Sequence, residues 1–245
     1  MLRFIASAIF LVTFLIIAIP LLLVEWIIGL FSKNVKAYSS LRIVQWAFKV
    51  LIKICGIQVT IIGEEHIPDE AVLFVGNHRS IFDTVLTYSR VKRLTGYVAK
   101  DSMEKTPLFS AWMRNLNCLF LNRDNPKEGL KTILQAIEYI KAGISICIFP
   151  EGGRNKGEEL TMLPFKAGAF KVSTKTNCAI IPMSINNAIG IFEQQFPRVK
   201  KTHVVIEYGK PIYPNDLEPE NKKQIGAYVQ NIIQETIQKN SALIE

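Results

Sequence analysis

Apolar residues dominate the start of the chain. Between Phe4 and Phe31 the only charged residue is Glu25. About 20 apolar residues cross a bilayer core, whereas the apolar part of a signal peptide has about 7–15. No convincing small-residue cleavage site follows the stretch. The pattern predicts a membrane-associating helix over residues 4–31, and Pro20 allows a kink or a break into two shorter helices.

Residues 41–56 form a second, amphipathic segment, with polar positions three and four residues apart on one side of a helix. Two placements fit this pattern. We favour a helix in the lipid headgroup region with its cations toward anionic lipid; the alternative is a helix packed on the soluble domain with a solvated basic edge. Lysines and arginines gather after the first apolar stretch, so the charge bias places the following domain in the cytosol. The polar positions are Arg42, Gln45, Lys49 and Lys53.

Beyond residue 57, short apolar runs alternate with segments of helical period. This alternation predicts one α/β domain over residues 58–245, with a largely parallel central sheet flanked by helices, after membrane-anchoring helices in residues 1–57. Ligands bind such sheets at the carboxyl ends of the strands. We expect strands at Gln58–Gly63, Ala71–Gly76, Gly96–Ala99, Cys118–Leu121, Ile144–Phe149, Ala179–Ser184 and His203–Tyr208, and helices at Phe82–Ser89, Pro107–Arg114, Lys127–Ala142, Ala167–Thr174 and Lys222–Lys239.

A first candidate site follows the strand that ends at Gly76. His78 carries an imidazole, the side chain best suited to accept a hydroxyl proton near neutral pH. Asp83, five residues later, can hold one ring nitrogen and leave the other facing a substrate. The alternative is structural, because Ser80 and Asp83 also fit a capping box at the start of the next helix. The two roles are compatible, since a capped helix fixes Asp83 near the preceding turn.

Two further clusters also follow apolar strands. Gly152 and Gly153 let backbone N–H groups approach an anion, and Arg154 offers a planar fork that grips phosphate. The same residues also suit a plain surface turn. Arg123 follows another strand and either binds phosphate or pairs with Asp124. If these strand ends converge, one crevice holds a base, its orienting carboxylate and several cations.

Charge and size narrow the choice of partners. The chain has 245 residues, enough to bury a core, and a formal net charge of +8. A basic balance suits nucleic acid, an anionic membrane surface or a phosphorylated substrate. No long Lys/Arg block and no zinc-finger or aromatic RNA-binding signature occurs. With the apolar N-terminus, a membrane partner is favoured and nucleic acid is not expected.

Cysteine, serine and carboxylate patterns exclude other chemistry. The four cysteines lie far apart without a CxxC pair, which indicates buried free thiols rather than disulfides or metal ligands. No serine stands in a GxSxG elbow, so a serine hydrolase is disfavoured. The carboxylates lack metal-ligand spacing with a histidine, so no metal site is expected. The cysteines are Cys55, Cys118, Cys147 and Cys178.

Four blocks of the chain, in order over about residues 71–184, resemble those of the PlsC-type glycerolipid acyltransferases, and within them the 1-acylglycerol-3-phosphate acyltransferases. The first and third blocks are the specific ones. One departure is Gly153, where threonine is commoner. The blocks are Asn77-His78 with Asp83, Phe120–Arg123, Phe149–Arg154, and Ile180–Ser184 with its central proline.

The resemblance implies direct transfer of a fatty acyl group from acyl carrier protein or coenzyme A to the sn-2 hydroxyl of 1-acylglycerol 3-phosphate, with no cofactor. His78 would be the general base, assisted by Asp83. Lys100 stands where family members often carry a phosphate-binding lysine, although a solvated surface lysine fits equally. The remaining residues implied to bind the acceptor are Asn77, Arg123, Glu151, Gly152, Gly153 and Arg154.

The resemblance also implies a location at the cytoplasmic face of a cell membrane of the bacterial inner-membrane type, with anionic lipid as a partner. The motifs alone do not separate two alternatives. One is an acyltransferase of the same superfamily that acts on glycerol 3-phosphate or another lysophospholipid. The other is a catalytically silent lipid-binding protein.

Overall fold

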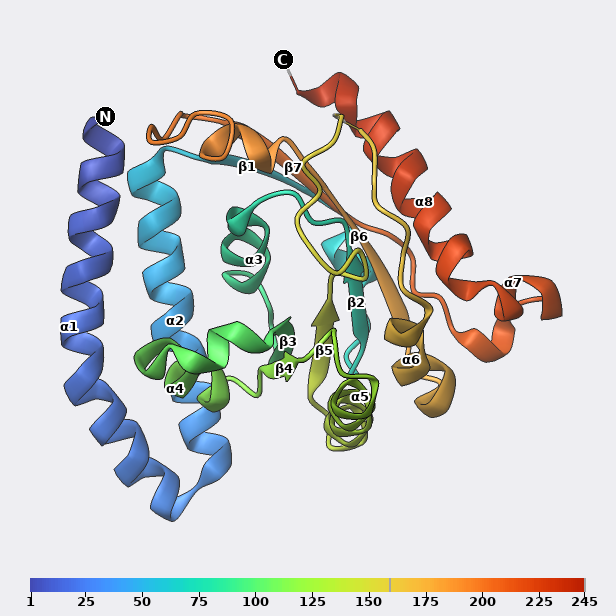
Figure 1. The fold of residues 1–245 in the computed structure, drawn as a ribbon, viewed down its shortest axis with the longest axis horizontal. Coiled ribbons are helices and arrows are strands. Elements are labelled where there is room, and N and C mark those ends of the chain that lie inside the picture. The colour runs from blue at the N-terminus through green and yellow to red at the C-terminus, as the bar shows by residue number, and fades with distance from the viewer. Residues whose placement is uncertain (159, 245) are drawn as a thin grey trace.

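The computed structural model describes residues 1–158 and 160–244, and it consists of a helical hairpin beside an α/β domain (Figure 1). The hairpin pairs α1 (Leu2–Phe31) with α2 (Lys33–Cys55), and Ser32 joins them in extended conformation. The helix α1 continues through Pro20, so of the two outcomes considered for this proline, a kink or a break, the break does not occur. The helix α2 begins at Lys33, well before the expected start at residue 41.

The helix α1 is apolar but largely exposed. Its buried residues are Ser7, Ala18 and Glu25, whereas most of its large apolar side chains face outward. Glu25 accepts a hydrogen bond from Ser39 Oγ of α2 at 2.7 Å, which ties the hairpin together. Within the described residues, α1 is the one helix long and apolar enough to cross a membrane, a test that a signal sequence also passes. An exposed apolar surface of this size is consistent with membrane association.

The helix α2 packs on the α/β domain, as in the second of the two placements considered for it. Gln45, expected in the polar stripe, is buried. Its Nε2 donates to the backbone oxygens of Val91 at 2.7 Å and Tyr88 at 3.3 Å. The amide therefore satisfies carbonyl groups at the end of the neighbouring helix, which explains a polar residue on the packed face. Arg42, Lys49 and Lys53 remain exposed.

The central sheet has seven strands in the order β1-β7-β6-β2-β5-β3-β4. The strands β6 and β7 pair antiparallel, and the other neighbours pair parallel. The expected largely parallel sheet is therefore confirmed. The strands are β1 (Gln58–Ile62), β2 (Leu73–Gly76), β3 (Thr95–Lys100), β4 (Leu119–Leu121), β5 (Ser145–Ile148), β6 (Ile180–Asn186) and β7 (His203–Tyr208).

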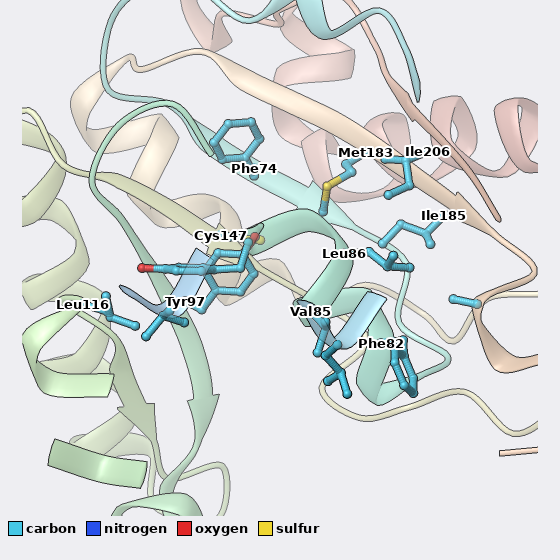
Figure 2. Packing of buried hydrophobic residues seen from close by; sticks show 14 of the residues in the cluster. Phe74, Phe82, Val85, Leu86, Tyr97, Leu116, Cys147, Met183, Ile185 and Ile206 are labelled. Carbon is cyan, nitrogen blue, oxygen red and sulfur yellow. The ribbon is translucent and has the colours of Figure 1, made fainter. Parts of the chain in front are cut away.

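Two apolar layers cover the two faces of the sheet, because successive strand residues point to opposite sides. Phe74 of β2 packs on the side of α2, α3 and α4, whereas its neighbours Leu73 and Val75 pack on the side of α5, α6 and α8. Figure 2 shows part of the first layer, with Phe74 and Met183 on the strands and Leu86 on α3. The helices are α3 (Ile81–Tyr88), α4 (Pro107–Asn115), α5 (Pro126–Lys141), α6 (Lys171–Thr176), α7 (Pro219–Lys223) and α8 (Ile225–Asn240).

The four cysteines are free, and three of them are buried, which confirms the expectation of unpaired thiols. Burial raises the pKa of the Cys118 thiol to about 11 and raises the pKa of Cys147 as well. A thiol with a raised pKa carries little thiolate at neutral pH, so these side chains behave as small apolar groups.

Candidate functional site

The predicted site residues follow strands whose carboxyl ends lie at one edge of the sheet. The parallel neighbours β2, β5, β3 and β4 end at Gly76, Ile148, Lys100 and Leu121. The segments that follow them carry the candidate base, the glycine-rich turn and two of the cations. The order of the strands therefore brings candidate site residues from distant parts of the sequence to one edge of the sheet, as expected for a parallel sheet.

His78 and Asp83 form a direct pair. His78 Nδ1 lies 2.9 Å from Asp83 Oδ2, and the Asp83 side chain is buried. The carboxylate partner indicates that Nδ1 carries the ring proton, which leaves Nε2 as a proton acceptor. The predicted contact between these two side chains is confirmed.

Asp83 also caps α3, so both roles considered for it coexist. Its Oδ2 accepts from the backbone nitrogens of Arg79 and Ser80, each at 2.7 Å. Ser80 Oγ in turn accepts from Phe82 N at 3.0 Å, which completes a capping box. One oxygen thus receives three donors, and the carboxylate is held in place before any substrate binds.

Glu151 holds the backbone of His78. Its Oε1 accepts from His78 N at 2.6 Å, and its Oε2 accepts from Leu163 N at 2.8 Å. Burial raises the pKa of Glu151, while the Leu163 and His78 N–H groups act in the opposite direction. The resemblance implied acceptor binding for Glu151, but both of its oxygens bind backbone groups, which makes it a positioning residue.

The turn after β5 fixes His78 from two more directions. Asn155 N donates to His78 O at 2.7 Å. The His78 ring stacks on Phe149, with ring centroids 4.4 Å apart and planes inclined by 15°. With Asp83 on one ring edge and Phe149 on one face, the imidazole has a single defined orientation.

Asn77, also implied to bind the acceptor, lies buried between two strands. Its Nδ2 donates to Ile185 O at 2.9 Å, and its Oδ1 accepts from Ile185 N at 2.8 Å. The side-chain amide thus extends the pairing of β2 with β6 beyond Gly76. These bonds give the buried Asn77 side chain a structural role, and its implied contact with an acceptor stays a prediction.

The glycine-rich turn differs from a simple anion cradle. Gly152 has φ of +74°, a conformation that favours glycine, and a Cβ there would lie 2.9 Å from Lys166 Nζ. Gly152 N donates to Phe149 O at 3.1 Å, so this N–H closes the turn instead of facing an anion. Around Gly153, by contrast, an added Cβ meets nothing within 4 Å, and this position has room for a side chain.

Three predicted cations lie exposed at this edge. Arg123 Nη1 donates to Gly152 O, which brings the end of β4 against the turn. Among the described residues, Arg123 forms no ion pair with Asp124, the alternative partner considered for it. Lys100 is exposed at the end of β3. Arg154 Nη1 lies 3.1 Å from Glu193 Oε1. The cations lie at the same edge of the sheet as the dyad, without the extensive hydrogen bonding that fixes His78 and Asp83.

Two residues at this edge were missing from the sequence prediction. Glu193 accepts from Ser80 Oγ at 2.7 Å and from Ile81 N at 2.8 Å, in addition to its pair with Arg154. Lys166 places its side chain against Gly152. No spacing in the sequence marks either residue, because both reach the site from segments that follow no motif.

A hollow of about 270 Å³ lies on the α3 side of the sheet. Phe74, Tyr97, Met183 and Tyr208 contribute its apolar wall, and charged residues lie at its rim. The Tyr97 ring lies 6.5 Å from that of Phe149, which stacks on His78. The hollow therefore adjoins the dyad through one aromatic side chain.

Residues 58–186 match the family model described as Acyltransferase. Over 184 residues the chain is 29% identical to a probable 1-acyl-sn-glycerol-3-phosphate acyltransferase of Mycoplasma pneumoniae, covering 72% of this chain and 68% of that protein. It is 26% identical to the 1-acyl-sn-glycerol-3-phosphate acyltransferase of Saccharomyces cerevisiae, covering 76% of this chain but 60% of the yeast protein. The crystal structure of the acyltransferase PlsC from Thermotoga maritima has the same fold, with a TM-score of 0.76, 23% identity and 98% of each chain covered.

Proposed function

Because this chain belongs to the acyltransferase family, we propose that it transfers a fatty acyl group from a thioester to the sn-2 hydroxyl of 1-acylglycerol 3-phosphate, producing phosphatidic acid. The observation that carries the proposal is the His78–Asp83 pair, with 2.9 Å between Nδ1 and Oδ2, at the edge of the sheet where the cations gather. The names of the similar enzymes from Mycoplasma pneumoniae and Saccharomyces cerevisiae support the same acceptor.

In the proposed reaction His78 acts as general base. Its Nε2 accepts the proton of the acceptor hydroxyl while the hydroxyl oxygen bonds to the thioester carbonyl carbon. The carbon–sulfur bond then breaks, and His78 returns the proton to the leaving thiolate. Asp83 keeps the ring in the required tautomer and stabilises the imidazolium that forms. No acyl-enzyme is needed, and no cofactor takes part beyond the acyl thioester.

The acceptor phosphate is proposed to bind the exposed cations Arg123, Arg154 and Lys100. A guanidinium gives phosphate two parallel hydrogen bonds, which fixes orientation as well as affinity. Binding a remote phosphate aligns the hydroxyl with His78, and this alignment supplies much of the rate gain for a reaction between two bound substrates. Glu151 contributes by holding His78, not by touching the acceptor.

The enzyme is proposed to work at the cytoplasmic face of a membrane. The exposed apolar surface of α1 supports association with a bilayer, which also holds the acceptor and the product. The cations that follow α1 along the chain support a cytosolic catalytic domain. Acyl carrier protein and coenzyme A are both anionic, so the net charge of +8 suits either donor.

A panel of acceptors tests this function. The purified chain, in detergent micelles, is given acyl carrier protein or coenzyme A thioesters together with 1-acylglycerol 3-phosphate, glycerol 3-phosphate, lysophosphatidylcholine or neutral 1-acylglycerol. We expect the highest kcat/KM with 1-acylglycerol 3-phosphate. A preference for another acceptor would reassign the substrate, and incorporation into none would favour a silent lipid-binding protein.

A further inference from the structure

Glu193 occupies an unusual position for a loop carboxylate. It follows the short helical turn Ala188–Ile191 after β6, and its side chain is 21% exposed. From there it contacts a segment 113 residues earlier in the chain, at the start of α3. A carboxylate that is mostly withdrawn from water needs hydrogen-bond donors or cations that compensate for its lost hydration.

Its partners belong to both functional parts of the site. Oε2 accepts from Ser80 Oγ at 2.7 Å, and Oε1 accepts from Ile81 N at 2.8 Å. Oε1 also lies 3.1 Å from Arg154 Nη1. Ser80 and Ile81 form the first turn of α3, which carries Asp83, whereas Arg154 follows the glycine-rich turn. Glu193 is therefore a physical link between the turn that orients the base and an exposed cation.

We propose that Glu193 is a positioning residue for Arg154, holding its guanidinium in register with the His78–Asp83 dyad so that the acceptor phosphate and the reacting hydroxyl are correctly spaced. This inference rests on the proposed function. Arg154 is 46% exposed, and its contact with Glu193 uses Nη1 alone. Among the residues that the structure describes, the guanidinium makes no other hydrogen bond, which leaves Nη2 and Nε for phosphate.

The physical advantage is preorganisation. A long, exposed arginine samples many rotamers, and ordering it at the moment of binding costs affinity. An ion pair formed before binding removes part of that cost and directs the planar fork. The alternative is that Glu193 only caps α3, since it accepts from Ile81 N at the N-terminal turn of that helix. A cap would affect every substrate equally, whereas positioning of Arg154 affects only acceptors that carry phosphate.

The test measures kcat and KM of the full chain in micelles with 1-acylglycerol 3-phosphate and with neutral 1-acylglycerol. For Glu193→Ala we expect the KM for the phosphate acceptor to rise about three- to tenfold, the range of an ion pair with charged hydrogen bonds. The loss with the neutral acceptor, which reports only the contacts of Glu193 with the start of α3, should be clearly smaller than the loss with the phosphate acceptor. Glu193→Gln should restore most of the affinity, because an amide oxygen can still accept from Ile81 N and Arg154.

A double variant separates positioning from other effects. If Glu193 acts through Arg154, Glu193→Ala should add little to the KM of Arg154→Ala. Glu207→Ala is the matched control, since Glu207 pairs with Lys239 at 2.7 Å and accepts from Asn240 at 2.9 Å without contacting the site residues. Its KM should equal that of the wild type. Where the alanine variant unfolds, Glu193→Asp, which keeps the charge but shortens the side chain, should also raise the KM.

Three results would overturn the inference. The first is an unchanged phosphate-acceptor KM in Glu193→Ala, and the second is an equal loss with both acceptors, which would leave only the cap. If the wild type prefers the phosphate acceptor, the first or the second result contradicts this inference but not the proposed function. The third is a wild type without that preference, which would remove the proposed acceptor and this inference together.

Discussion

The dyad and the surrounding cations are built in opposite ways. Asp83 is buried, and its Oδ2 receives three donors, while His78 is held through its ring and its backbone. Arg154 is about half exposed, and Lys100 is exposed at a strand end. A group that moves a proton needs a fixed position, whereas a group that binds an anion needs free N–H groups. Under the proposed function, this difference means that the buried dyad performs the proton transfer and that the exposed cations bind the acceptor.

The two regions should also differ in their effect on stability. Leaving a buried hydrogen-bonding group without its partner costs about 1–3 kcal/mol. An exposed ion pair is worth about 0.2–1 kcal/mol. Substitutions around Asp83 and Glu151 should therefore affect both folding and turnover, while substitutions of Arg154 should affect acceptor binding alone.

The largest effect should follow His78→Ala. Loss of the general base should lower kcat about 10²–10⁴-fold, since this is the usual contribution of a positioned proton acceptor. His78 is partly exposed, so the fold should survive. Initial rates of acyl transfer, with circular dichroism as the folding control, measure this. Turnover near the wild-type rate would remove His78 from the mechanism.

Asp83→Asn should come next. Asp83 Oδ2 accepts from His78 Nδ1 and from both backbone donors, so an asparagine oxygen in its place can keep these contacts but carries no negative charge. The imidazolium that forms during the proposed reaction then loses its stabilising carboxylate. We expect kcat to fall about 10²-fold, because a neutral amide stabilises the imidazolium less than a carboxylate does. Urea unfolding should show a loss of about 1–3 kcal/mol as a donor loses its charged acceptor. Wild-type kcat in a folded variant would reduce Asp83 to a helix cap.

Glu151→Gln should have a smaller effect on turnover and a distinctive effect on stability. An amide cannot accept from both His78 N and Leu163 N, so His78 should shift and kcat should fall about tenfold. Glu138→Gln removes the charge of an exposed carboxylate that pairs with Lys141 and contacts no site residue, so it is the matched control and should keep the wild-type kcat. Unchanged kcat would show that Glu151 does not position His78.

The pH dependence of stability gives an independent check on Glu151. Its pKa is raised by burial, so the wild type is favoured while the carboxyl is protonated and loses that advantage as the pH rises through the raised value. Glu151→Gln does not titrate at this position. The free energy of unfolding of the wild type minus that of the variant should therefore fall as the pH rises above about 4.3, the usual value for Glu. A difference that grows with pH would contradict the raised pKa.

Arg154→Ala should change binding with little effect on chemistry or stability. The acceptor KM should rise about tenfold or more, because a guanidinium–phosphate contact is charge-assisted, while kcat should stay within about twofold. Lys156→Ala, an exposed cation two residues later, is the control for lost net charge and should keep the wild-type KM. An unchanged KM in Arg154→Ala would count against the phosphate clamp.

The sequence was informative wherever a local pattern decides the outcome. Apolar runs bounded by polar residues identified the strands, and their parallel order brought His78, Arg123 and the glycine-rich turn to one edge. The contact between His78 and Asp83 was predictable because a capping box at the start of α3 holds Asp83 near the turn that precedes the helix. Pro20 was a weaker guide, because the helix α1 continues on both sides of it.

Side-chain direction was not predictable in the same way. By its spacing Gln45 belongs to the polar side of its helix. Its side chain nevertheless points inward, because it donates hydrogen bonds to the backbone oxygens of Tyr88 and Val91. The side chain of Asn77 likewise forms two hydrogen bonds with the backbone of Ile185. Glu193 reaches the site across 113 residues, and no periodicity reports a contact at that separation.

The separation of chemistry from recognition is tested most directly by measuring how tightly His78→Ala binds 1-acylglycerol 3-phosphate. An equilibrium titration in micelles, without acyl donor, gives a Kd that contains no catalytic step. The cations are untouched in this variant, so we expect a Kd within about twofold of the wild type. A Kd weakened about tenfold or more would place His78 in acceptor binding and contradict a dyad whose work is confined to proton transfer.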